Sequence, residues 1–260
     1  MSLSAVIFDV DGTLADTEEI HRQSFNTAFR EFGLPWEWDV GLYIELLAVA
    51  GGKERIRHYC RMVDPARLRE PDIDELIASL HARKTVVYNQ QVARGGLPAR
   101  PGVLRLIRQL RDDGVRVAIA TTTSMANVES LLRTTLKSLP PNTFEVIGAG
   151  EHATAKKPAP DIYRWVAERL RLRPEECLAI EDSRNGVLAA SGAGMPVLVT
   201  VSPWSRGEDF TGSVAVLSDL GEPDRPYRPH RAIDGVSADT GFVDPVVLRR
   251  WHAQATTMAA

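Results

Sequence analysis

The chain has 260 residues, of which 44% are hydrophobic and 25% are charged. This length allows one large domain, or a domain that carries an insert, with a core that needs no disulfide bonds. The net charge of −3 argues against a nucleic-acid partner, which usually requires a basic excess. The apolar runs are too short to span a bilayer, so we expect no membrane partner.

The two cysteines, Cys60 and Cys177, are far apart in the sequence. This spacing argues against a disulfide framework and against a zinc site made of cysteines. The first residues lack the basic, apolar and small-residue regions of a secretory signal. We therefore expect a cytoplasmic protein in a reducing compartment, and we expect it to be a monomer.

The chain begins with a short apolar run that leads directly into acidic residues. Residues 5–8 read AVIF, and Asp9, Asp11 and Gly12 follow them. A short, continuously apolar run of this kind predicts a strand that is buried on both faces in a parallel sheet. Two carboxylates at the end of such a strand repel each other unless a cation neutralises them.

Residues 17–97 have a different character. Their apolar residues follow helical periodicity, as in HRQSFNTAFREFG (21–33) and in residues 72–93, and they include no convincing strand. The second helical stretch ends near the turn sequence GGLP. We therefore predict that a helical module is inserted after the first strand.

Strands and helices alternate from about residue 100 to residue 200. Short apolar runs at 115–120, 177–180 and 197–201 predict buried strands, and 143–150 is a further candidate. Amphipathic patterns predict helices over 101–114 and 160–172. This alternation is typical of an α/β layer fold with a parallel sheet.

The last region, residues 221–260, has no role that we can assign. Its first part is rich in Pro and Arg, so we expect it to be extended or irregular. Residues 244–254 predict one final helix, with Asp244 as its cap.

Polar side chains follow the predicted strands at the edge where an open α/β sheet binds its ligands. Oxygen ligands without Cys or His indicate a hard cation, most plausibly Mg²⁺. A metal with lysine and hydroxyl donors suits a phosphoryl group, and an ionised aspartate there can attack phosphorus. The residues concerned are Asp9, Asp11, Thr121, Thr122, Thr123, Lys156, Lys157, Glu181, Asp182 and Ser183.

Each of these motifs also has a simpler explanation when it is taken alone. DVDG occurs in turns and in calcium-binding loops, a threonine run often caps a helix, and KPAPD is an ordinary loop before a helix. An acidic pair after an apolar run, such as Glu181–Asp182, is common on protein surfaces. Their occurrence in this order, each at a strand end, favours one joint phosphoryl-transfer site.

Four segments resemble the ordered motifs of the haloacid dehalogenase superfamily: FDVDGTLADTE, VAIATTT, KKPAPDIY and AIEDSRNGV. The match covers residues 5 to about 205. The resemblance implies a Rossmann-like parallel-sheet core formed by residues 1–16 and 98–220, with an α-helical cap domain over residues 17–97. It also implies that Asp9 is the nucleophile and Asp11 the acid and base. Thr121 and Lys157 should hold the phosphate with Thr122 beside them, and Mg²⁺ should be bound by Asp9, the Asp11 carbonyl and Asp182, with Glu181 at or near it.

Three further segments, DTEEIHRQSFN, GGKERIRHY and LHARKTVVY, resemble the CbbY-like sugar-phosphate phosphatases. These enzymes are related to β-phosphoglucomutase and phosphoglycolate phosphatase. The resemblance implies hydrolysis of xylulose-1,5-bisphosphate to xylulose 5-phosphate, in connection with the Calvin cycle. A sugar phosphomutase and a phosphoglycolate phosphatase remain alternatives. A non-catalytic regulator that binds sugar phosphates is disfavoured, because a pure binder does not need Asp9 and Asp11.

The predicted cap contains candidate substrate ligands. Lys53 and Arg55 could grip a second phosphate, and Gly51 and Gly52 would allow a close backbone approach. A solvated basic face is the alternative for this segment. We also single out Glu18 and His21 near the site entrance, Lys84 from its resemblance to the cap lysine of sugar phosphomutases, and Arg184 and Asn185 opposite the cap opening. A surface role stays open for His21 and Lys84.

Overall fold

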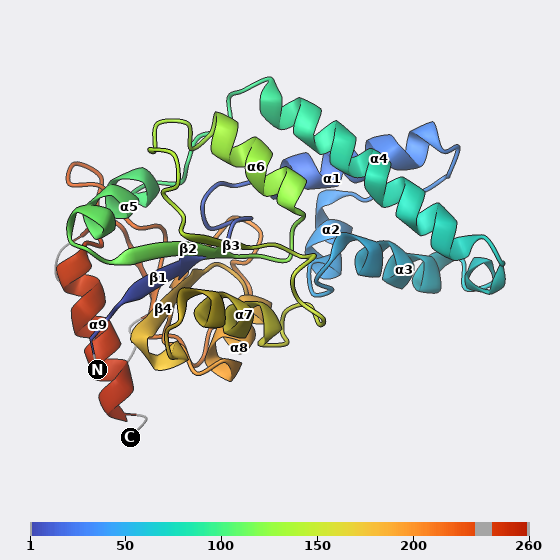
Figure 1. Cartoon of the computed structure of the whole chain (residues 1–260). Coiled ribbons are helices and arrows are strands. Elements are labelled where there is room, and N and C mark those ends of the chain that lie inside the picture. Colours follow the sequence, from blue (N-terminus) through green and yellow to red (C-terminus); the bar gives the residue numbers. More distant parts are fainter. Residues whose placement is uncertain (1, 232–240, 259–260) are drawn as a thin grey trace.

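The computed structural model of the chain describes residues 2–231 and 241–258 (Figure 1). Its centre is one sheet with the strand order β3-β2-β1-β4-β5-β6-β7. The neighbouring strands pair in parallel, except that β7 is antiparallel to β6. This confirms the predicted α/β class. The strands are β1 (Ala5–Phe8), β2 (Arg116–Ala120), β3 (Val146–Gly148), β4 (Cys177–Glu181), β5 (Val197–Thr200), β6 (Ala215–Leu217) and β7 (Pro229–Arg231).

The continuously apolar sequence of β1 is explained by burial on both faces of the sheet. Successive side chains of a strand point to opposite faces. Val6 and Phe8 join one hydrophobic core with α5 (Val103–Asp112), α6 (Met125–Thr134) and α9 (Pro245–Met258). Ala5 and Ile7 join a second core with α7 (Asp161–Leu170) and α8 (Arg184–Gly192). Helices therefore cover both faces, and the carboxyl ends of the strands carry the polar residues.

The register of the sheet brings three strand ends level with one another. Phe8 at the end of β1 pairs with Ile119 of β2 and with Ile180 of β4. The residues that follow these positions must therefore lie side by side. A short 3₁₀ helix, η2 (Pro174–Glu176), leads into β4.

A helical region lies beyond the carboxyl ends of the strands, to the right in Figure 1. It contains α1 (Glu18–Glu31), α2 (Val40–Leu46), α3 (Gly52–Val63), the 3₁₀ helix η1 (Arg67–Arg69) and α4 (Ile73–Ala93). These helices enclose a hydrophobic core of their own, in which Phe25, Phe29, Trp36, Trp38 and Tyr43 pack ring against ring. We call this region the cap. Its limits at residues 17 and 97 stay our proposal.

The region after Gly221 packs against the sheet core. Tyr227, Val243, Leu248 and Trp251 are buried in the same core as Val6 and Phe8. The predicted cap of the last helix is present, since Asp244 Oδ1 accepts a hydrogen bond from Val247 N at 2.8 Å. β6 was not predicted, because three residues carry little periodicity. Residues 232–240 and 259–260 of the predicted extension, and Met1 of the predicted core, lie outside the described residues.

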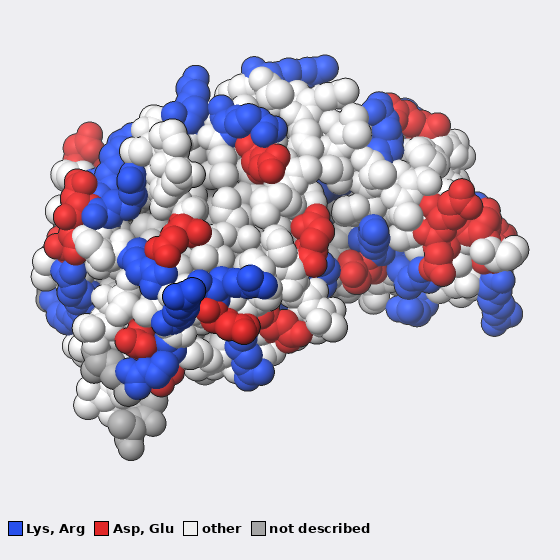
Figure 2. All heavy atoms as spheres, viewed as in Figure 1, with Lys and Arg blue, Asp and Glu red and all other residues white. Residues whose placement is uncertain are grey.

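None of the helices in the described part of the chain is both long and apolar enough to cross a membrane. Basic and acidic side chains are interspersed over most of the face in Figure 2. This mixture agrees with the small net charge of −3.

Candidate active site

A cavity of about 520 Å³ lies where the cap meets the carboxyl ends of the strands. Most of the predicted site residues line it. From the sheet side these are Asp9, Asp11, Thr121, Thr122, Lys157, Asp182 and Asn185, and from the cap side Glu18, His21, Gly51, Gly52, Lys53, Arg55 and Lys84. Glu181 is fully buried behind the cavity. Arg184 does not line it, because its guanidinium donates to Thr211 O at 2.9 Å and faces Asp209 at 3.8 Å.

Three buried carboxylates meet at the floor of the cavity. Ligand atoms of Asp9, Glu181 and Asp182 all lie within 4.8 Å of one another. Lys157 Nζ bridges two of them, at 2.6 Å from Asp9 Oδ1 and 2.5 Å from Glu181 Oε1. Tyr163 OH donates a further hydrogen bond to Glu181 Oε1 at 2.6 Å. The lysine of the third motif is therefore in direct contact with the predicted nucleophile.

Burial and mutual repulsion control the ionisation of this cluster. Burial raises the pKa of Asp9, and the Lys157 charge opposes that rise. Burial also raises the pKa of Asp182, and the charges of Asp9 and Glu181 add to the rise. For Lys157, burial acts to lower the pKa, but the Asp9 and Glu181 carboxylates raise it above its ordinary value. One lysine does not balance three carboxylates, so the cluster favours a further cation or a bound proton.

These residues fit a hard divalent cation. Carboxylate oxygens with no sulfur or imidazole among them are the ligands that Mg²⁺ prefers. The backbone also approaches the cluster closely, since a Cβ at Gly12 would lie 2.1 Å from Asp182 Oδ2. Gly12 has φ of +81°, which favours glycine in any case. Asp9 and Asp182, with the carbonyl of Asp11, could therefore hold Mg²⁺, with Glu181 behind them.

Asp11 begins a series of hydrogen-bonded side chains that leads into the cap. Its Oδ1 accepts a hydrogen bond from Thr17 Oγ1 at 2.5 Å and lies 3.0 Å from His21 Nε2. His21 Nδ1 lies 2.6 Å from Lys84 Nζ, and the His21 ring stacks on Tyr88 at 4.1 Å. Both His21 and Lys84 are buried, which argues against the surface role left open above.

The ionisation of the hydrogen-bonded series Asp11–His21–Lys84 differs from that of the carboxylate cluster. Burial by itself would raise the pKa of Asp11, but His21, Thr17 and Lys84 lower it to about 2. Burial lowers the pKa of Lys84 to about 8, against the attraction of Asp11 and Glu18. Asp11 is therefore ionised at neutral pH. A charged Lys84 donates to His21 Nδ1, which leaves the proton of a neutral His21 on Nε2, facing Asp11.

Thr121 and Thr122 follow β2 and reach the cavity without capping a helix. Ser124 is the cap of α6, because its Oγ accepts a hydrogen bond from Asn127 N at 3.4 Å. Thr121 Oγ1 accepts one from Thr123 N at 3.2 Å. The helix cap is therefore Ser124, the residue after the threonine run, and not one of the threonines. Thr121 and Thr122 stay available for a phosphate.

On the cap wall, Glu18, Tyr43 and Arg55 form one hydrogen-bonded group. Tyr43 OH donates to Glu18 Oε2 at 2.7 Å and accepts from Arg55 Nη1 at 3.2 Å. Arg55 Nε donates to Leu46 O at 3.1 Å. Tyr43 was not predicted as part of the site, since nothing in its local pattern distinguishes it from a core aromatic residue.

Within the cap, Gly51 is favoured by its backbone conformation and Gly52 by a neighbouring ring. A Cβ at Gly51, which has φ of +93°, would lie 2.1 Å from Glu54 Oε2. A Cβ at Gly52 would lie 2.5 Å from the His81 ring. Their presence therefore does not by itself indicate that a substrate passes close to the backbone.

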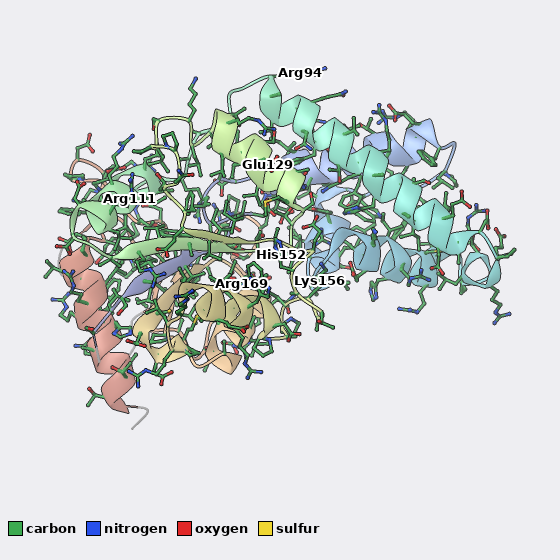
Figure 3. All side chains as sticks on the ribbon, viewed as in Figure 1. Arg94, Arg111, Glu129, His152, Lys156 and Arg169 are labelled. Carbon is green, nitrogen blue, oxygen red and sulfur yellow. The ribbon has the colours of Figure 1, made fainter. Side chains whose placement is uncertain are left out.

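The cap touches the core at the rim of the cavity. Asn185 Nδ2 donates to Ala48 O at 3.0 Å, and Trp204 meets Tyr43 edge-on with ring centroids 5.6 Å apart. Figure 3 shows Lys156 where the loop between β3 and α7 reaches the cap, and this side chain lines the cavity. Sequence reasoning missed Trp204 and His81, which also line it. Their contacts depend on long-range packing that no local motif signals.

Comparison with known proteins defines the class to which this fold and site belong. The haloacid dehalogenase-like hydrolase family matches residues 3–194. The chain therefore belongs to the haloacid dehalogenase-like hydrolases, and it is a phosphatase-type enzyme of the CbbY kind, which confirms the resemblance read from the motifs.

Individual relatives support the assignment to the CbbY kind of phosphatase. The plasmid-encoded protein CbbY of Cupriavidus necator is 48% identical over 250 residues, covering 96% of this chain and 97% of the relative. CbbY from Rhodobacter sphaeroides, solved in complex with phosphate, is 43% identical with a TM-score of 0.77, covering 84% of this chain and 94% of that one. An Asp-to-Asn mutant of the same protein, solved in complex with xylulose-(1,5)bisphosphate, is 42% identical at the same coverage and TM-score.

Proposed function

We propose that this phosphatase hydrolyses a small sugar phosphate with the help of Mg²⁺ through an aspartyl-phosphate on Asp9, and that xylulose-1,5-bisphosphate is its substrate. The observation that carries the proposal is the buried Asp9 carboxylate, which lies between Lys157 and the acidic cluster on the cavity floor. The similarity to a protein solved with this bisphosphate supports the choice of substrate. A cytoplasmic location, a connection with the Calvin cycle and a monomeric state belong to the same proposal.

The first half of the reaction uses the floor of the cavity. Mg²⁺, when bound, would neutralise charge on the phosphoryl group and on the carboxylates. Lys157 now donates to Asp9, Ala120 O and Glu181, and it would bind a phosphoryl oxygen next to Asp9 by exchanging one of these acceptors. An ionised Asp9 oxygen attacks phosphorus, the bond to the sugar oxygen breaks, and the leaving oxygen takes a proton.

In this proposal, Asp11 handles protons in both halves of the reaction. Its pKa is lowered to about 2, so it is ionised and can take a proton from the water that attacks phosphorus in the second half, as the bond between phosphorus and Asp9 breaks. To protonate the leaving sugar oxygen in the first half, it must first receive a proton. His21 would relay it: Nε2 gives its proton to Asp11 at 3.0 Å while Nδ1 takes one from Lys84 Nζ at 2.6 Å, which leaves Lys84 neutral.

The activity should therefore depend on the charge of Lys84. Because its pKa lies at about 8, Lys84 is protonated below that pH and loses its charge as the pH rises. We expect kcat/KM, which reports the free enzyme, to fall above about pH 8 with a limiting slope of about tenfold per pH unit. The measurement is a pH–rate profile for the wild type and Lys84→Gln. The variant should have a lower plateau without this decline, and the same decline in both proteins would remove Lys84 from the account.

A bisphosphate can contact basic residues from both sides of the cavity. Lys157 lies on the floor beside Asp9, and Lys53 and Arg55 line the opposite wall in the cap. Arg55 is held in place by its bonds to Tyr43 and Leu46. A guanidinium held this way loses little side-chain entropy when it binds a phosphate.

Arg55→Ala should therefore reduce kcat/KM for xylulose-1,5-bisphosphate more than for p-nitrophenyl phosphate. A charge-assisted hydrogen bond contributes about 1.5–3 kcal/mol, or roughly one to two powers of ten. Arg57→Ala is a matched control, because Arg57 lies in the same helix but forms an ion pair with Asp74 outside this cavity. Equal losses on both substrates would show that Arg55 supports cap folding and not recognition.

A phosphomutase is the second candidate, since the buried pair of His21 and Lys84 lines the cavity and Lys84 lies in a segment that resembles the mutases. Product analysis separates the two functions. We expect xylulose-1,5-bisphosphate to yield inorganic phosphate and a monophosphate. We expect β-glucose 1-phosphate to yield little glucose 6-phosphate. Rapid isomerisation of β-glucose 1-phosphate, without phosphate release, would establish the mutase instead.

A further inference from the structure

Arg100 is a buried arginine at the point where the chain returns from the cap to the core. Its residue exposure is only 7%. Its backbone N donates to Leu14 O at 2.9 Å, and the neighbouring Ala99 forms an antiparallel bridge with Ala15. The two connections between cap and core therefore run side by side at Arg100.

The guanidinium of Arg100 joins these connections to the ends of two strands. An arginine has five N–H donors in a fixed planar arrangement, and here its three nitrogens all contact oxygens of the protein. Nε lies 3.2 Å from Asp16 Oδ1, in the outgoing connection. The other acceptors are Gly12 O, Thr200 O at 2.9 Å, Thr200 Oγ1 at 3.1 Å, Val201 O at 2.7 Å and Ser218 O at 2.9 Å.

The contact with Gly12 reaches the candidate metal cluster. Gly12 lies in the loop that carries Asp9 and Asp11, and its Cα faces Asp182 so closely that a Cβ would overlap the carboxylate. Any movement of the Gly12 peptide would change the separation between the Asp11 carbonyl and Asp182. Arg100 opposes such movement, because it binds the Gly12 carbonyl.

We propose that Arg100 is a positioning residue, which fixes the loop of residues 9–16 against the ends of β5 and β6 and so ties the cap connections to the geometry of the carboxylate cluster. Its effect on the rate rests on the proposed function. Its effect on the order of the loop does not, so the two can be tested separately.

Arg100→Lys keeps the positive charge but loses the planar set of five donors. We expect amides of residues 11–17 to exchange with deuterium at least about tenfold faster in this variant. Loss of a residue that orients ligands typically costs roughly 10–100-fold. We therefore expect kcat to fall by that factor and the Mg²⁺ activation midpoint to rise, with KM within about threefold of wild type.

Arg105→Lys is a matched control. Arg105 donates to Gly221 O at 2.6 Å and Val243 O at 2.8 Å and pairs with Glu222 at 3.0 Å, and these partners do not line the cavity. This variant should speed exchange near residues 220–222 and leave kcat unchanged. An equal loss of kcat in both variants would reduce Arg100 to a general stabilising residue and overturn the proposal.

Unchanged exchange of residues 11–17 in Arg100→Lys would also overturn the proposal. If Arg100→Lys does not fold, Asp16→Asn removes only the ion pair. It should speed exchange of the same segment by a smaller factor, and unchanged exchange there would again contradict the positioning role.

If the wild type releases no phosphate from any ester tested, the proposed function fails. Hydrogen exchange then decides the role of Arg100 alone.

Discussion

Asp9→Asn should abolish phosphate release while the protein stays folded. An amide cannot attack phosphorus, and it offers neither Lys157 nor a metal the charge of the carboxylate. Because a single electrostatic contact in a transition state accounts for roughly 10²–10³-fold, we expect loss of the nucleophile to lower kcat by more than about 10³-fold. Steady-state phosphate release with saturating Mg²⁺ measures this effect.

Asp113→Asn provides the control for this substitution. Asp113 pairs with Arg249 of the last helix and does not line the cavity, so the same chemical change there should leave kcat within about twofold. Circular dichroism and the melting temperature should show both variants folded. Turnover of Asp9→Asn within a few-fold of the wild type would exclude Asp9 as the nucleophile.

Asp182→Asn should have the second largest effect, and its signature is the response to Mg²⁺. Asp182 is buried beside Asp9, and its carboxylate is one of the three oxygen groups that could hold the ion. Neutralising it removes a ligand charge, so we expect the Mg²⁺ concentration for half-maximal activity to rise and kcat to fall by more than about 10²-fold. A titration of activity with Mg²⁺ measures both.

Glu181→Gln should lose less activity than Asp182→Asn and therefore serves as a comparison. Glu181 is held by Lys157 and Tyr163 behind the cavity, so it orients the residues in front of it. Losses of such outer residues are typically roughly 10–100-fold, and this variant should therefore be milder than Asp182→Asn. An Asp182→Asn enzyme with the Mg²⁺ activation curve of the wild type would show that Asp182 is not a metal ligand.

The sheet and the floor of the cavity could be predicted from sequence because their determinants are local. A strand such as β1 is buried on both faces and is therefore apolar throughout, so its composition alone distinguishes it from its surroundings. Parallel register then places the residues after Phe8 and Ile180 next to each other. Asp9 therefore lies beside Glu181, and Asp182 comes one residue after that position.

Other features depend on packing between distant segments and leave no local pattern. Tyr43 reaches Glu18 and Arg55 through the fold of the cap, and Arg100 collects carbonyl oxygens from residues up to 118 positions away. The residues after Gly221 looked irregular because of their Pro and Arg content. Trp251 and Tyr227 are nevertheless buried in the main core, which only the three-dimensional structure reveals.

The most direct test of the account is the initial rate of phosphate release from xylulose-1,5-bisphosphate by the wild-type protein, with Mg²⁺ and with the metal chelated. We predict rapid release of one phosphate per substrate molecule with Mg²⁺. Chelation should lower the rate by at least about 10²-fold, because the carboxylates of Asp9 and Asp182 then stay without their counter-ion. Release at the same rate after chelation, or no release from this substrate while another phosphate ester is hydrolysed rapidly, would contradict the proposed function.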